Sequence, residues 1–265
     1  MRRPVLLIGA VAGVLAAALA GLLVFANPFG APARVVNAAR LLDPAKFSAA
    51  QQPVVTRINA APEDAEFFVA LGEAFPKDQT RILDALGQNA LAAASPDLAL
   101  GEAVRSLSQS RGILAARASE AALDTVFAAQ AEVAGALAKA DARLCVDFIY
   151  GSASQGYYDF AAANRALTSA YALAGLNAIV DGQRAKLERD KPSEADFKAL
   201  ETVLTGAGLS KPEIAAFIDG APPDPPLPDD RLCAAGLTYF KTLARLPAPL
   251  RMRFYGLMTE LMSKG

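Results

Sequence analysis

Two cysteines are the residues of this chain best suited to chemistry, and both occur in the same short pattern. Residues 141–145 and 229–233 each spell Asp-x-Arg-Leu-Cys and end at Cys145 and Cys233. In each copy the acid is placed to cap a helix, and the cysteine falls in the first turns of that helix. Because two cysteines in an oxidising compartment most often pair, we predict a structural disulfide. Two other interpretations stay open: a thiol made reactive by the helix start and the arginine, or two buried apolar side chains.

The chain contains no histidine, and this absence limits its chemistry. Without an imidazole there is no Ser-His-Asp or Cys-His relay and no histidine ligand for a metal. Two cysteines this far apart, with no histidine, also make a poor zinc site. Catalysis by carboxylates alone or by a Ser-Lys pair remains open. We therefore predict no catalytic, metal-binding or cofactor-binding residue, and no cofactor.

The glycine spacing of residues 151–156 comes close to that of a ligand-binding motif. The segment has the two glycines of a phosphate loop, but tyrosines replace the Lys-Ser/Thr that should follow. It also lacks the Gly-x-Ser-x-Gly spacing of a nucleophile elbow. We interpret the segment as a turn between helices. The alternative is that Ser152 or Ser154 lines a pocket beside the tyrosines.

Two groups of side chains are candidates for an interaction surface. Aromatic side chains with polar tips are enriched at interfaces, and the aromatic group consists of Tyr150, Tyr157 and Tyr158. The basic group, which can contact acidic lipid head groups or an acidic partner, consists of Lys241, Arg245, Arg251 and Arg253. Core packing is the plainer explanation for the tyrosines, and a solvated face is the plainer one for the basic residues.

The elements that position these residues are predicted to be helices. Alanine and leucine, both strong helix formers, are abundant, and the β-branched and aromatic enrichment of strands is missing. The fold class is therefore all-α, an irregular multi-helix bundle with a C-terminal helical hairpin. Caps and hydrophobic spacing predict helices over residues 62–75, 78–94, 96–107, 119–140, 157–189, 194–204, 230–246 and 249–262. A capping box is expected at Ser193, and Ser210 is expected to cap a further short helix that closes at Gly220.

The domain organisation follows from composition along the chain. The predicted parts are a signal anchor over 1–27, a linker over 28–35, a main helical domain over 36–220, a proline-rich connector over 221–229, and a C-terminal hairpin over 230–265 that packs on the main domain. The connector is expected to be extended and stiff because it is dense in proline.

The N-terminal segment predicts a membrane anchor. Arg2 and Arg3 precede an uncharged apolar run over residues 5–26, which at about 1.5 Å per residue spans about 33 Å, the thickness of a bilayer core. Such a run is long for a cleaved signal peptide, although residues 31–33 have the small-x-small form of a cleavage site. The arginines favour a cytoplasmic N-terminus and export of the large domain. The alanine-rich composition suggests a bacterial envelope protein, single-pass in the inner membrane with a periplasmic domain; secretion to the periplasm after cleavage is the alternative.

Function is narrowed by exclusions more than by motifs. A net charge of −1 argues against a nucleic-acid partner, because a duplex binder needs a surplus of lysine and arginine. The leading hypothesis is a membrane-anchored, non-catalytic protein whose exported domain binds an unidentified protein or assembles a complex. The alternatives are an envelope enzyme that uses carboxylates or a Ser-Lys pair, and a helical carrier of an apolar ligand.

Overall fold

The computed structural model describes residues 40–88, 96–152, 154–220, 223 and 225–264, and within them every regular element is helical. This confirms the all-α fold class. The α-helices are α1 (Gln52–Asn59), α2 (Pro62–Ala74), α3 (Pro76–Gln88), α4 (Pro96–Arg111), α5 (Glu120–Ala140), α6 (Ala142–Ile149), α7 (Gln155–Ala163), α8 (Arg165–Ala185), α9 (Glu194–Gly206), α10 (Lys211–Ile218), α11 (Asp229–Ala244) and α12 (Ala248–Met262). Two 3₁₀ helices, η1 (Pro44–Lys46) and η3 (Gly112–Arg117), accompany them.

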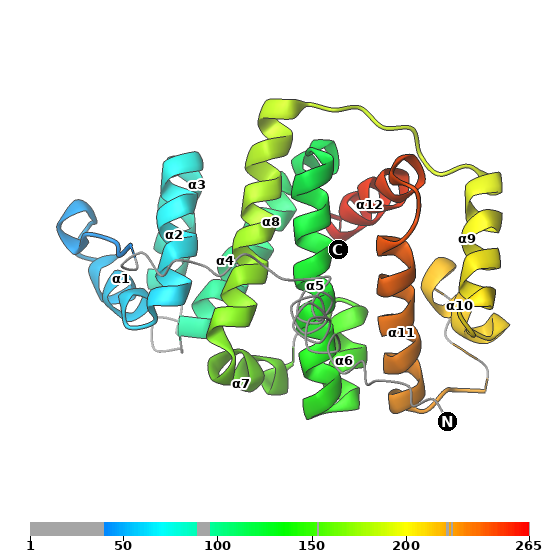
Figure 1. Ribbon diagram of the computed structural model, residues 1–265. Coiled ribbons are helices and arrows are strands. Elements are labelled where there is room, and N and C mark those ends of the chain that lie inside the picture. Colours follow the sequence, from blue (N-terminus) through cyan, green and yellow to red (C-terminus); the bar gives the residue numbers. More distant parts are fainter. Residues whose placement is uncertain (1–39, 89–95, 153, 221–222, 224, 265) are drawn as a thin grey trace, which may run out of the picture. The chain divides into compact units, whose positions relative to one another are not determined.

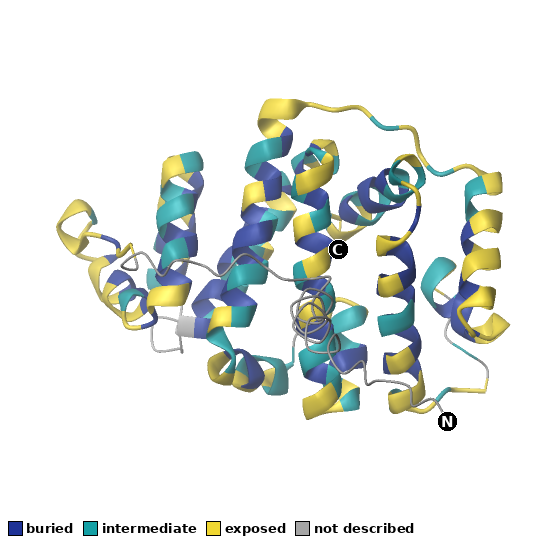
Figure 2. Cartoon of the chain, viewed as in Figure 1, coloured by how far each residue is buried: buried dark blue, intermediate teal, exposed yellow. Residues whose placement is uncertain are grey.

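Two long helices, α5 and α8, lie side by side at the centre of the bundle (Figure 1). Helices α2 and α4 cover one side of α8, while α6 and α11 pack on α5. Helices α9 and α10 pack on α11, and α12 packs mainly on η3. Figure 2 shows that the buried residues lie on the faces that these helices turn towards one another. The core is therefore built from single apolar faces of amphipathic helices.

Helix α8 approaches η3 so closely that one position between them must be glycine. A Cβ atom on Gly182 would lie under 3.0 Å from the carbonyl oxygen of Leu114 and 2.7 Å from its carbonyl carbon. Beyond the end of α8, Arg189 donates hydrogen bonds to the carbonyl oxygens of Ala116 and Ala118. The packing of α8 and the guanidinium of Arg189 therefore hold η3 in place from two sides.

Several helix starts agree with the caps predicted from the sequence. The carboxylate of Asp141 accepts hydrogen bonds from the backbone N–H groups of residues 143 and 144. Ser193 and Ser210 each form a capping box, with Asp196 and Glu213 as the acidic members. Asp229 differs from Asp141: it is the first residue of α11, whose N-cap is Pro228 without a side-chain hydrogen bond. The two Asp-x-Arg-Leu-Cys copies therefore share sequence but not cap geometry.

The single helix predicted over residues 157–189 is wrong. The structure divides it into α7 and α8 at Asn164, whose backbone leaves the helical region (φ −130°, ψ 36°). The Asn164 side chain donates to the carbonyl oxygen of Phe160, the local hydrogen bonding by which asparagine competes with a continuous helix. The predicted helix over 78–94 also differs: α3 begins at Pro76 and is described to Gln88.

The two C-terminal helices follow one another through Leu246 and Pro247, as the sequence suggests, but they do not pack as an isolated hairpin. Helix α11 packs chiefly on α5 and α6, and α12 packs chiefly on η3. The described residues form one compact unit. The predicted domain boundaries within this unit remain a prediction, and most of the N-terminal half of the proline-rich connector lies outside the described residues.

The predicted anchor over 1–27 and the linker over 28–35 also fall outside the described residues, so both stay predictions. Within the described part of the chain, α5 alone has the length and mean hydropathy of a membrane span. Its apolar face is buried in the bundle at Leu123, Val126, Phe127, Val133 and Leu137. We therefore interpret α5 as a core helix.

Candidate functional site

The two cysteines are joined in a disulfide between α6 and α11, with their Cα atoms 5.7 Å apart. This agrees with the predicted pairing. The exposed fractions of Cys145 and Cys233 are 0% and 3%, and Val133, Leu137 and Leu232 pack in the same apolar cluster. Since neither sulfur faces solvent, the disulfide has a structural role, and it closes a segment of 88 residues that contains α7 to α10.

The predicted basic group does not form one free surface. Arg251 forms ion pairs with Asp124 and Glu120 on α5, and its side chain is only 15% exposed. Arg253 binds the carboxylate of Asp196 through two nitrogens, at 3.0 and 2.6 Å. Two further members, Lys241 and Arg245, are exposed on and after α11. Arg251 and Arg253 therefore fasten α12 to α5 and α9, and they are not available to a partner as free charges.

The predicted aromatic group divides into two. Tyr157 stacks on Phe148 and meets Tyr158 edge to face. Tyr150 stacks instead on Phe217, which in turn stacks on a buried tyrosine of α11. Burial raises the pKa of Tyr157 well above its ordinary value, so its hydroxyl stays neutral. Of the three predicted tyrosines, Tyr150 is the one classed as exposed.

Residues 150 and 151 lie in a turn after α6, whereas residues 155 and 156 already belong to α7. Gly151 has a positive φ of 77°, which suits glycine. The Ser154 hydroxyl accepts a hydrogen bond from the backbone N–H of Tyr157 and caps α7. Ser152 is exposed, and neither serine lines the two hollows described below. The turn interpretation is therefore the one that fits these residues.

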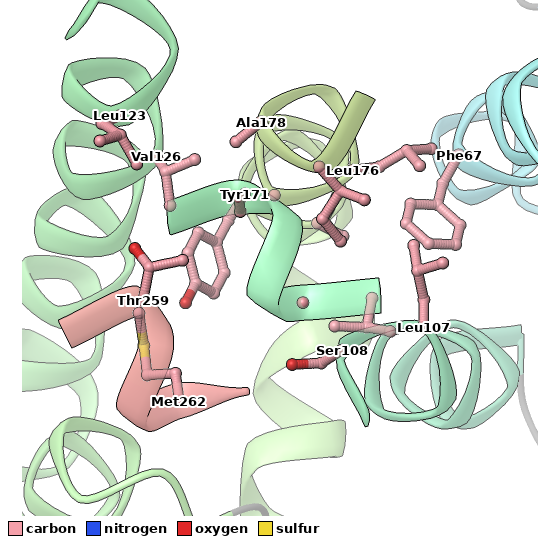
Figure 3. A pocket seen from close by; sticks show the side chains of 16 residues that line it. Phe67, Leu107, Ser108, Leu123, Val126, Tyr171, Leu176, Ala178, Thr259 and Met262 are labelled. Atoms are coloured by element: carbon pink, nitrogen blue, oxygen red, sulfur yellow. The ribbon is translucent and has the colours of Figure 1, made fainter. Parts of the chain in front are cut away.

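An apolar pocket of about 130 Å³ lies where α2, α4, η3, α5, α8 and α12 meet. Figure 3 shows Phe67 and Leu107 at one end, Leu123 and Val126 at the other, and Thr259 and Met262 beside Tyr171. The pocket is partly open rather than sealed. Its further lining residues are Val104, Ser108, Gly112, Ala115, Ala172, Gly175, Leu176, Ala178 and Ile179.

The side chains that line this pocket are suited to binding an apolar group and not to catalysis. The lining holds no carboxylate and no basic side chain; its polar side chains are the hydroxyl-bearing Ser108, Tyr171 and Thr259. The Thr259 hydroxyl already donates to the carbonyl oxygen of Tyr255. Burial raises the pKa of Tyr171 to about 12, so that its phenol stays protonated at neutral pH. No group in the lining can therefore act as a general acid or base near neutrality.

A second hollow, of about 220 Å³, lies between α3 and α4. One wall is apolar, with Ile82 and Leu86 from α3, and the other carries Glu102 and Arg105 from α4. These two charged side chains form an ion pair with each other one turn apart along α4. Because the two charges cancel, this wall carries no net charge, and no further acidic or basic residue lines the hollow.

Buried carboxylates are the feature that sequence reasoning missed. Asp97 binds Arg165 through both carboxylate oxygens, each at 2.9 Å. Asp64 accepts a hydrogen bond from the hydroxyl of Ser169, and burial raises its pKa to about 6. Asp64 lies in the first turn of the helix predicted over residues 62–75, where an acidic residue is ordinary, and no neighbouring residue in the sequence indicates that α8 buries it.

None of these carboxylates forms a recognisable active site. Neither Asp64 nor Asp97 lines either hollow. Glu213 is held by Arg231 and Ser210; burial alone would raise its pKa, but these hydrogen bonds lower it overall. Among the residues whose placement is described, no three potential ligands gather to hold a metal ion.

Comparison of the chain with protein-family models, with curated proteins and with solved structures found no match.

Proposed function

We propose that this chain is a membrane-tethered protein of the bacterial envelope whose exported helical domain binds a protein partner. The apolar pocket is the socket in which one apolar side chain of that partner is held. The observation that carries the proposal is the combination of a partly open apolar pocket with exposed apolar side chains at one lining residue and at two residues next in sequence to the lining.

The size of the pocket favours a side chain over a free ligand. Sites for small molecules usually measure about 300–1,000 Å³, and this pocket measures about 130 Å³. An apolar cavity of about 150 Å³ accommodates one benzene-sized group. A leucine, methionine or phenylalanine side chain is of that size, whereas a lipid chain is not. A carrier of lipids is therefore disfavoured.

The surroundings of the pocket favour a protein surface. Met262, which lines the pocket, is 41% exposed. Its neighbour Leu261 is 57% exposed, and Ile113, next to the lining residue Gly112, is 46% exposed. Large exposed apolar side chains beside a pocket are typical of an interface centre, where an anchor residue enters a desolvated pocket.

The disulfide supports export. Disulfides persist in oxidising compartments and are rare in the cytosol, and this one joins two buried cysteines in the structure. Export agrees with the apolar segment that follows Arg2 and Arg3. The enzymatic alternative is disfavoured, because the buried carboxylates lie away from both hollows.

A cavity-filling variant tests the proposal. Gly175 lines the pocket, and a Cβ atom there would meet nothing within 4 Å. A side chain at this position therefore starts in open space, and we expect Gly175→Leu to fill the pocket. Gly135 on α5 has the same open surroundings, lies outside the pocket lining, and provides the matched control Gly135→Leu.

The assay is site-specific photocrosslinking in the native cells, with the crosslinker at position 262. Position 203 on α9, whose valine is 45% exposed, is the control position. We expect a discrete adduct from position 262 that is retained in Gly135→Leu and lost in Gly175→Leu, although both variants stay folded. If position 262 gives no adduct, or gives the same adduct after the pocket is filled, the proposal is wrong.

A further inference from the structure

Asp64 is the most isolated buried charge of the structure's described part. Its exposed fraction is 1%, and one carboxylate oxygen accepts from Ser169 of α8. The other oxygen, Oδ2, is buried without a hydrogen-bond partner. A buried carboxylate with a single neutral donor is poorly stabilised in its charged form.

The charged groups near Asp64 do not stabilise its ionised form either. Arg165 is the cation near it, but both of its bonded nitrogens are held by Asp97 of α4. Glu63, the preceding residue on α2, and Asp97 both repel a charge on Asp64. Three carboxylates thus share one guanidinium, and the Asp97 carboxylate occupies it.

The position of Asp64 connects this contact with the pocket. Phe67 lies one turn after Asp64 on α2 and lines the pocket. Ala172 lies one turn after Ser169 on α8 and lines the same pocket. The Asp64–Ser169 hydrogen bond therefore joins the two helices immediately beside one wall of the pocket.

We propose that Asp64 is a proton-operated latch, which holds α2 against α8 when its carboxyl group is protonated and loosens that contact when it ionises. The latch regulates how firmly Phe67 is held in the pocket wall. Its effect on partner binding rests on the proposed function, whereas the latch itself does not.

The burial of the carboxyl group decides how closing of the latch depends on pH. Its pKa is about 6 in the folded state, raised by burial from an ordinary value of 3.8. Between these two values the closed state binds a proton that the opened state does not, so closing is favoured in acid and weakens as pH rises through about 6.

Amide hydrogen exchange of α2 tests the latch on the full-length protein without any partner. After correction for intrinsic exchange rates, the opening of α2 should increase about tenfold between about pH 5 and about pH 7.5, as calculated from the two pKa values by linkage. In Asp64→Asn, which keeps the size and the acceptor for Ser169, this dependence should disappear. Opening of α2 that is independent of pH in the unmodified protein would overturn the proposal.

A second measurement tests the latch if Asp64→Asn does not fold. The carboxyl carbon of Asp64 can be titrated by NMR in the unmodified protein, and a midpoint about two units above the ordinary value is expected. A midpoint near 3.8 would overturn the latch. If position 262 gives no adduct, or gives the same adduct after the pocket is filled, the proposed function is overturned and the latch still stands, so the two failures are distinguishable.

Discussion

Replacing Gly182 by alanine tests the close packing of α8 on η3, which forms one wall of the pocket. The added Cβ would lie 2.7 Å from the carbonyl carbon of Leu114 and 3.1 Å from the backbone nitrogen of Ala118. Carbon atoms in contact prefer about 3.5–4.0 Å, so α8 and η3 must separate by about 1 Å. The obstacle is backbone, which cannot turn aside as a flexible side chain can.

The expected magnitude is the difference between two opposing effects. Alanine is favoured over glycine inside a helix by about 1 kcal/mol. Overpacking a core usually costs about 1–3 kcal/mol, and more where the neighbour cannot move. The hydrogen bonds from Arg189 to Ala116 and Ala118 hold the same η3 segment and would be strained as it shifts. With the overpacking cost at the upper end of its range, about 3 kcal/mol, we expect Gly182→Ala to lower the free energy of unfolding by about 2 kcal/mol.

Gly135→Ala is the control, because it makes the same chemical change where nothing lies within 4 Å of the new methyl group. It should raise the free energy of unfolding by up to about 1 kcal/mol. Urea denaturation followed by circular dichroism measures both variants, with the m-value checked for constancy. If Gly182→Ala were as stable as the unmodified protein, the close approach of α8 to η3 would be incorrect.

Two further predictions concern the disulfide and an ion pair. Replacing Cys145 and Cys233 by alanine should lower the free energy of unfolding by about 4–5 kcal/mol in the chain-entropy model, given their separation of 88 residues; a loss under about 1 kcal/mol in urea denaturation would contradict this. Hydrogen bonds from Arg253 and from the backbone of Ser193 lower the pKa of Asp196 to about 2, so its contribution is present above the ordinary value of 3.8 and is lost as pH falls through about 2. Arg253→Met should therefore be less stable than the unmodified protein at neutral pH, and the difference in the free energy of unfolding should narrow as pH falls from about 4 to about 2. A difference that does not change with pH in urea denaturation would refute the pairing.

Features set by neighbours along the chain could be predicted from the sequence. The caps by Asp141, Ser193 and Ser210 depend on hydrogen bonds that reach only two or three residues along the chain. The disulfide could be inferred because its two cysteines share a local pattern and the chain offers no other cysteine. The all-helical class followed from the abundance of alanine and leucine.

Features that depend on distant residues could not be predicted. Arg251 and Arg253 were interpreted as part of a basic surface, but their acidic partners lie 127 and 57 residues away. Asp64 resembles an ordinary first-turn acid, and its burial depends on Ser169, 105 residues later. The pocket is formed by side chains from six elements, so no local sequence pattern predicts it.

Export of the helical domain is the claim on which the proposed function depends most, and the oxidation state of Cys145 and Cys233 in intact cells tests it directly. Because both side chains are buried, cells are first quenched in acid and then denatured in the presence of a maleimide of high mass, with and without prior reduction. The single variant Cys145→Ala confirms that the reagent reaches a free thiol. We expect no labelling of the unmodified protein before reduction and two labels per chain after it. Two labels without reduction would place the domain in a reducing compartment and contradict the account.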